Sequence, residues 1–264
     1  MTDIRQELLR LIALNNAERW VPNHVAIKEL ERHGNRLIPG LIECLSDEDA
    51  EVRCLAAGLL DEAGKRAEPA VNALIERLSD EDRNVIVAAV FCLKRLGQIA
   101  RPAVPALKRL LDDEKEPYAR LVIAGALGKI SPEDPSAAPV LVKGLSDPND
   151  LHRAAACEFL GEMRHKSAVL NTMALFGDPD FMVRFAAARA VGRTFGNWLH
   201  AAAMCVEMLK DANETNRAMG AECLLRIRRY AYDHLDLLTM ALVDAPWDVR
   251  LDIEEVLEIL RRQQ

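Results

Sequence analysis

Two columns of charged residues recur along the chain and are the first candidates for chemistry. Aspartates stand 31 to 34 residues apart, at Asp47, Asp80, Asp113, Asp147, Asp178, Asp211 and Asp244. Six or seven residues after each aspartate stands an arginine, with one exception: Arg53, Ile86, Arg120, Arg153, Arg184, Arg217 and Arg250. Such pairs can bind phosphate or take part in acid–base catalysis. Because each pair falls near the same edge of a repeated unit, where it can hydrogen-bond turns and helix ends, we predict a structural ladder instead.

The residues that serve as metal ligands or nucleophiles form no recognisable site. The histidines stand singly, without an H-x-x-x-H motif or a His-Glu pair: His24, His33, His152, His165, His200 and His234. The cysteines form no C-x-x-C pair, and each lies in an apolar helical stretch: Cys44, Cys54, Cys92, Cys157, Cys205 and Cys223. We predict no metal and no cofactor. Buried free thiols suit the reducing cytoplasm, where we expect the protein.

Composition limits the class of protein. Of the 264 residues, 50% are hydrophobic, 28% are charged and 5% are aromatic, which excludes a disordered chain, a collagen-like fibre and a disulfide-rich miniprotein. The net charge of −7 gives no overall attraction to nucleic acid or anionic lipid. No stretch reaches the roughly 18 apolar residues of a membrane span. The chain also lacks G-x-S-x-G, Walker-type and G-x-G-x-x-G motifs, so we predict that it is not an enzyme.

The charged columns belong to a longer repeat. LIPGLIECLSDEDAEVRCLAAGLLDEAG, from Leu37, is followed by AVNALIERLSDEDRNVIVAAVFCLKRLG, from Ala70, and five further copies follow at the same period. Each copy predicts two helices. The first opens with a proline, as at Pro39, Pro69, Pro102 and Pro139. A turn with capping residues comes next, and the second helix is rich in alanine and ends near a glycine.

This pattern resembles HEAT repeats, in particular the short bacterial type also called PBS-lyase HEAT-like repeats. The resemblance rests on the aspartate column, the Val-Arg pair (Val52-Arg53, Val183-Arg184) and the alanine-rich stretch after it. It implies an all-α, right-handed α-solenoid of about seven to eight two-helix repeats. We expect a single domain over residues 1–264, with seven repeats in 35–264. Residues 1–34 would form a degenerate capping repeat with helices near 3–15 and 23–33.

In HEAT solenoids the second helices line the concave face, which usually binds a partner. The residues five and nine positions after the column arginine should both point there, one helical turn apart. Two clusters combine apolar groups with positive charge, and residues 184–230 carry a balance of +4. We predict that Phe91 and Phe185 anchor the partner while arginines bind its acidic groups. The predicted partner-binding residues are Val87, Phe91, Arg95, Leu121, Lys129, Phe185, Arg189, Arg193 and Arg226.

The sequence therefore predicts a monomeric, non-enzymatic scaffold that binds a protein partner with an acidic segment. Two alternatives stay open because related folds have other activities. HEAT-like DNA glycosylases place basic and aromatic residues along the concave face, and Arg189, Arg193 and Arg226 are compatible with that. A bilin lyase-like protein would share the repeat type alone. The deoxyhypusine hydroxylases, which hold iron with His-Glu pairs, do not fit, since the chain has no such pair.

Overall fold

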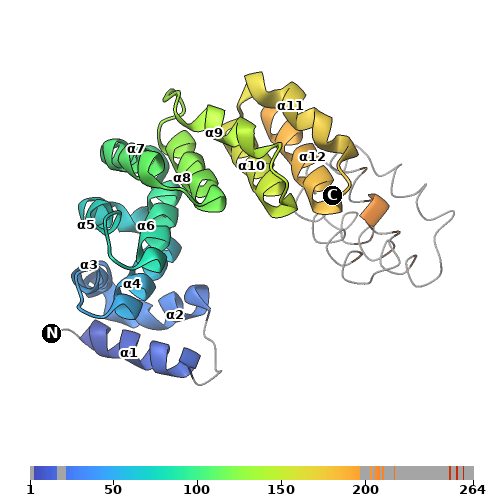
Figure 1. Ribbon diagram of the computed structural model, residues 1–264. Coiled ribbons are helices and arrows are strands. Elements are labelled where there is room, and N and C mark those ends of the chain that lie inside the picture. Colours follow the sequence, from blue (N-terminus) through green and yellow to red (C-terminus); the bar gives the residue numbers. More distant parts are fainter. Residues whose placement is uncertain are drawn as a thin grey trace. The chain divides into compact units, whose positions relative to one another are not determined.

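The computed structural model shows helices joined by short turns (Figure 1). It describes residues 3–16 and 22–196, and beyond them positions 203, 206–208, 210, 217, 250, 254 and 258. No strand occurs in these described residues. The predicted fold class, an all-α solenoid of two-helix repeats, is confirmed. Nor does any helix in the described part have the length and apolar character needed to cross a membrane.

Contacts divide the chain into two compact units, Met1–Val140 and Leu141–Gln264, so the single domain over residues 1–264 stays a prediction. Unit 1 holds α1 (Asp3–Asn16), α2 (Asn23–Leu30), α3 (Leu37–Cys44), α4 (Ala50–Ala63), α5 (Val71–Arg77), α6 (Arg83–Leu96), α7 (Val104–Asp113) and α8 (Pro117–Ile130). Helix α9 (Ala137–Gly144) contains the boundary. Unit 2 holds α10 (Asp150–Met163), α11 (Val169–Ala174) and α12 (Phe181–Phe195). Short 3-10 segments include η2 (Gly64–Ala70) and η3 (Gly97–Ala103).

Capping residues set the ends of the second helix in the repeats. The Asp49 carboxylate accepts a hydrogen bond from the backbone N–H of Glu51 at 2.9 Å and so caps α4. Asp82 caps α6 in the same way, through the backbone N–H of Asn84 at 2.7 Å. Helix α4 ends at Gly64, whose φ of +58° is a conformation that favours glycine.

The first helix differs from the prediction in two repeats, whereas Pro39 and Pro139 lie in the first turns of α3 and α9, as predicted. Pro69 and Pro102 lie inside the 3-10 segments η2 and η3, and the α-helices begin two residues later, at Val71 and Val104. Proline has no backbone N–H to donate, so it fits a short 3-10 turn that precedes the regular α-helical ladder. The predicted helix is thus a 3-10 turn followed by a short α-helix.

Alanine and glycine allow the second helices to pack closely. Within unit 1, α4 packs against α6 and α6 against α8, and within unit 2 α10 packs against α12. Ala56, Ala57 and Ala89 are completely buried. At Gly161 of α10, a Cβ atom would lie 2.6 Å from the Cα of Ala190 in α12, closer than any real contact. A larger residue at position 161 would push these helices apart.

Two arginine–aspartate pairs of the charged columns link neighbouring repeats, as the predicted structural ladder requires. The Nη1 group of Arg53 donates to the carbonyl oxygens of Asp47 and Glu48 in its own turn, at 2.9 and 3.0 Å. Its Nε and Nη2 groups donate to the carboxylate of Asp80 in the next repeat, at 2.9 and 2.7 Å. Arg153 binds Asp178 in unit 2 by the same two-pronged contact, at 2.8 Å for both bonds. The prediction of a structural role is confirmed for these pairs.

The ladder has two features that the column pattern did not reveal. At the N-terminal end, Arg5 of α1 binds Asp47 at 2.5 and 3.1 Å, so α1 supplies the arginine for the first full repeat. In the second repeat Ile86 replaces the arginine. There the exposed Arg83 pairs with Glu114 at 3.1 Å and with Glu116 at 3.7 Å instead.

Candidate partner-binding groove

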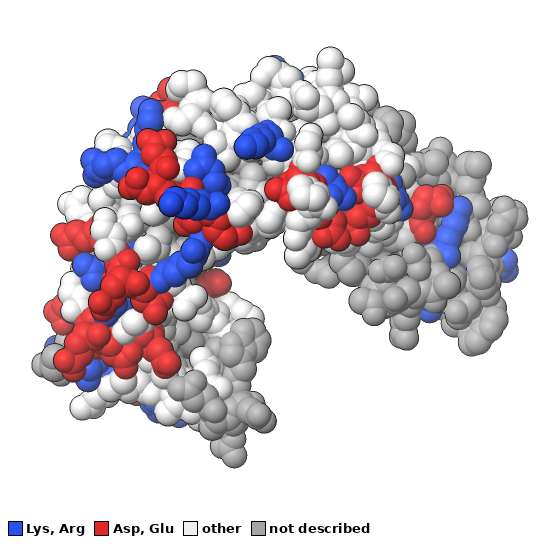
Figure 2. Space-filling model, in the orientation of Figure 1, with Lys and Arg blue, Asp and Glu red and all other residues white. Residues whose placement is uncertain are grey.

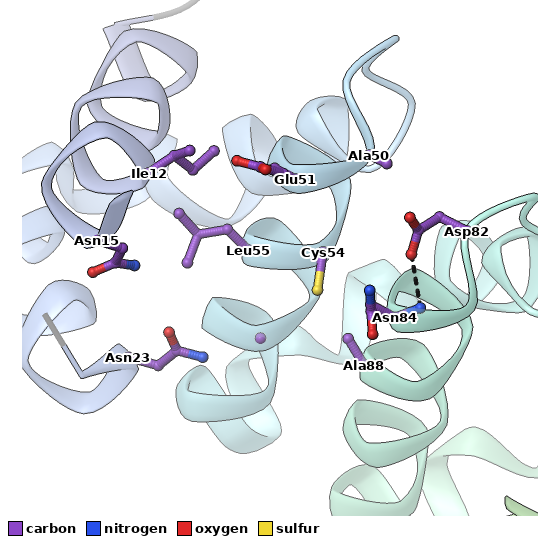
Figure 3. A pocket seen from close by; sticks show the side chains of 11 residues that line it. Ile12, Asn15, Asn23, Ala50, Glu51, Cys54, Leu55, Asp82, Asn84 and Ala88 are labelled. Atoms are coloured by element: carbon purple, nitrogen blue, oxygen red, sulfur yellow. Dashed lines mark hydrogen bonds between the residues drawn. The ribbon is translucent and has the colours of Figure 1, made fainter. Parts of the chain in front are cut away.

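A groove in unit 1 lies between α1 and α2 on one side and α6 on the other, with α4 between them (Figure 3). Its first part has a volume of about 450 Å³. A second part of about 370 Å³ continues along α4 and α6, and the two share Asn23, Cys54, Gly58, Asn84 and Ala88. We call the two parts together the α4–α6 groove. Its lining is Ile12, Asn15, Asn23, Ala50, Glu51, Cys54, Leu55, Gly58, Asp61, Asp82, Asn84, Val87, Ala88 and Phe91.

Apolar side chains form much of this surface. Ile12 and Leu55 point toward one another between α1 and α4 (Figure 3). Val87 is half-buried, and Phe91 leaves 38% of its surface exposed at the far end. A large aromatic group open to solvent beside a groove is typical of a contact site for another molecule. Among the predicted residues, Val87 and Phe91 therefore line the groove.

Glycine at position 58 shapes the floor. A Cβ atom there would lie 2.6 Å from the side-chain nitrogen of Asn23 in α2. The glycine therefore lets the Asn23 amide lie directly against α4. The side-chain amides of Asn23 and Asn84 make no hydrogen bond to other described residues, so they are available to a bound ligand. An amide can donate and accept at once, as recognition of a peptide backbone requires.

Cys54 is the one lining residue with a nucleophilic atom. Burial raises the pKa of its thiol, and the negative charges of Asp82 and Glu51 raise this pKa further. The thiol therefore stays protonated near neutral pH, which is the state of a structural cysteine rather than a reactive one. The groove can bind a ligand through apolar and amide contacts, but Cys54 is not poised for covalent chemistry.

The predicted cationic residues are mostly neutralised by neighbouring carboxylates. Both oxygens of Asp61 accept hydrogen bonds from Arg95, each at 2.7 Å, and the Glu62 carboxylate lies 4.0 Å from the same guanidinium. In unit 2, Glu158 accepts from Arg189 at 3.2 Å and from Arg193 at 2.7 Å. Lys129 on α8 is exposed and makes no ion pair within the described ranges. Arg226 lies outside the described residues.

Two predicted contact residues are in the core, and their placement on the binding surface was wrong. Leu121 and Phe185 are each only 3% exposed. Both directly follow a column arginine, but this repeat position is not buried throughout, since Cys54 and Val87 occupy it in α4 and α6 and are only partly buried. The guanidinium of Arg189 lies 5.4 Å from the centre of the Phe185 ring and helps to cover it. Phe185 is therefore a packing residue and not an anchor for a partner.

Comparison with known families accounts for the repeat. Matches to the HEAT-repeat model cover residues 7–94, 71–150 and 138–197, which together exceed half of the chain. The chain belongs to the HEAT-repeat family. A search of curated proteins finds no match to this HEAT-repeat chain.

One solved structure shows the same fold, and a second has a lower structural similarity. A chain from the complex of CpcE and CpcF of phycocyanin lyase from Nostoc sp. PCC7120 is 22% identical, with a TM-score of 0.57 over 84% of this HEAT-repeat chain and 94% of that chain. The YibA protein of Escherichia coli is 19% identical, with a TM-score of 0.48 over 88% and 84% of the respective chains. At such low identity these likenesses concern the fold alone.

Sequence reasoning missed much of the groove of this HEAT-repeat protein. Gly58 and Phe91 stand five positions after residues 53 and 86, where the concave face is predicted. That prediction extends only toward the C-terminal ends of the helices. Counting back along the same helical face leads to Cys54 and Glu51 on α4 and, past the predicted Val87, to Asn84 on α6. Ile12 and Asn23 carry no repeat signal, because α1 and α2 do not follow the regular spacing.

Proposed function

We propose that this protein is a non-enzymatic scaffold that binds a protein partner in the α4–α6 groove. HEAT-repeat solenoids are typical of such scaffolds, and the partly exposed Phe91 beside an apolar groove is the observation that carries the proposal. Ile12, Leu55 and Val87 offer apolar contacts, while the amides of Asn23 and Asn84 offer hydrogen bonds. The proposal includes a cytoplasmic monomer.

The neutralised arginines affect which kind of partner the protein can bind. A partner with an acidic segment, as the sequence predicts, would find Arg95, Arg189 and Arg193 already paired with carboxylates. The DNA-binding alternative rests on the positive charges of Arg189, Arg193 and Arg226. The same pairing neutralises Arg189 and Arg193 and so weakens this alternative. A protein partner held mainly by apolar contacts agrees better with these pairs.

Site-specific photo-cross-linking tests the proposal in the native cell extract. A photoreactive phenylalanine replaces Phe91 in one variant and the exposed Asn72 of α5 in a matched control. We expect one discrete protein adduct from position 91 and none of that mass from position 72. The adduct should disappear when Ala88→Trp fills the groove. Equal adducts from both positions, or no adduct from position 91, would contradict the proposal.

A further inference from the structure

We propose that the occupant of the α4–α6 groove is a basic segment of the partner, in which an apolar side chain is flanked by Lys or Arg. This inference rests on the proposed function. The groove is lined by three carboxylates, those of Glu51, Asp61 and Asp82, and by no lysine or arginine. Charge complementarity therefore selects a cationic ligand.

The three carboxylates differ in how much charge they present. Asp61 is neutralised by Arg95, since both of its oxygens are used. Glu51 is exposed, and its carboxylate makes no ion pair to another described residue. Asp82 caps α6 through Oδ1 alone, and no cation within the described ranges pairs with it. Glu51 and Asp82 thus keep negative charge at the mouth of the groove.

Neighbouring turns extend this acidic character. The residues before α4 and α6 include Glu48 and Glu81, whose side chains are 93% and 88% exposed. The nearby arginines are shared: Arg5 binds Asp47 and lies 3.9 Å from Glu48, and Arg53 binds Asp80 and lies 3.5 Å from Glu81. Figure 2 shows acidic side chains gathered on the visible face of the N-terminal part of unit 1. A cation approaching the groove meets carboxylates that the ladder leaves in excess.

Burial is the main reason why the pKa of Cys54 is raised, and the charges of Asp82 and Glu51 raise it further, which agrees with a negative potential in the groove that its carboxylate lining creates. Different lining residues would then bind different parts of the ligand. Ile12, Leu55 and Phe91 would hold the apolar side chain of the ligand, and its flanking cations would meet Glu51 and Asp82. An arginine of the ligand could also stack on the exposed Phe91 ring. Nucleic acid would be repelled by the same carboxylates.

Selection from a phage-displayed library of random dodecapeptides on the full chain tests the inference. Enriched peptides are then labelled, and their binding is measured by fluorescence polarisation. The charge variant is Glu51→Gln with Asp82→Asn, since asparagine keeps the capping oxygen. The matched control, Glu43→Gln with Glu68→Gln, removes two exposed charges from the first-helix part of the repeats.

We expect enriched peptides with a net positive charge and at least one large apolar residue. The charge variant should weaken their binding roughly 3- to 30-fold, the effect of two exposed ion pairs, while the control changes it less than twofold. Acidic or neutral peptides that Ala88→Trp displaces would overturn the basic occupant and leave the groove as the binding site. If Ala88→Trp displaces no enriched peptide, the proposed function fails, and the inference fails with it.

Discussion

The guanidinium of Arg53 joins two repeats: it holds two carbonyl oxygens of its own turn and, through two parallel hydrogen bonds, the carboxylate of Asp80 in the next turn. The side chains are 6% and 3% exposed. Pairs of this geometry orient both partners, and neither charge can be left alone without cost. The ladder therefore fixes how one helix pair is placed against the next.

Breaking this pair should destabilise the protein strongly. Arg53→Ala removes two hydrogen bonds from the buried Asp80 carboxylate, which keeps only Arg77 at 3.4 Å and the Asp82 backbone N–H. It also leaves two turn carbonyls without their donor, so we expect the free energy of unfolding to fall by about 3 kcal/mol. Urea denaturation followed by circular dichroism measures the change. Arg83→Ala is the control, because the Arg83 side chain is 56% exposed and its ion pairs are of little value. Similar losses in the two variants would contradict a special role for the ladder.

Acid should weaken the ladder over a defined pH range. Hydrogen bonds from Arg5 and Arg153 lower the pKa of Asp47 and of Asp178, respectively, below the usual aspartate value. A lowered folded-state pKa means that the contribution is complete above the unfolded value of about 3.9 and is lost as the pH falls through the folded pKa. We expect the free energy of unfolding to decline below about pH 4, as urea titrations at a series of pH values would show. Asp178→Asn should make that decline shallower, and an unchanged slope would count against this account.

Alanine substitutions should have different effects at the two predicted aromatic anchors, Phe185 and Phe91. Phe185→Ala removes a buried ring and should lower the free energy of unfolding by about 3 to 5 kcal/mol. Phe91→Ala removes a partly exposed ring and should cost about 1 kcal/mol or less, while abolishing the binding of the selected peptides. Thermal unfolding and fluorescence polarisation on the same samples distinguish the two. If both variants lost stability equally, Phe91 would be a core residue and not a contact residue.

Close packing in unit 2 predicts an unusual effect of alanine. A helical Gly→Ala substitution normally stabilises, but Gly161→Ala places a Cβ atom against the backbone of Ala190 and should cost about 1 to 3 kcal/mol. Gly177 provides the control, because a Cβ atom there meets nothing within 4 Å. Thermal denaturation should show a lower midpoint for Gly161→Ala only. A stabilised Gly161→Ala protein would mean that α10 and α12 can move apart freely.

The sequence predicts the repeat, the caps and the ladder well, because each depends on local chemistry at a fixed spacing. The Asp82 cap and the Arg53–Asp80 pair follow directly from that spacing. Side-chain direction is harder to predict, since one residue along a helix turns the side chain by about 100°. Burial also varies at one repeat position, because Phe185 is buried whereas Val87, at the same position of its repeat, is half-buried. The Arg95–Asp61 pair was not predicted, because neither residue belongs to the aspartate and arginine columns.

The isoleucine at position 86 has a consequence for how the chain unfolds. Where an arginine bridges two turns, one repeat cannot open without releasing its neighbour, so adjacent repeats should melt together. Between α6 and α8 the bridge is missing and only the exposed Arg83 pairs take its place. Cooperative unfolding should therefore be weaker across this junction, which makes it a boundary within unit 1 between segments that exchange amide hydrogens at different rates.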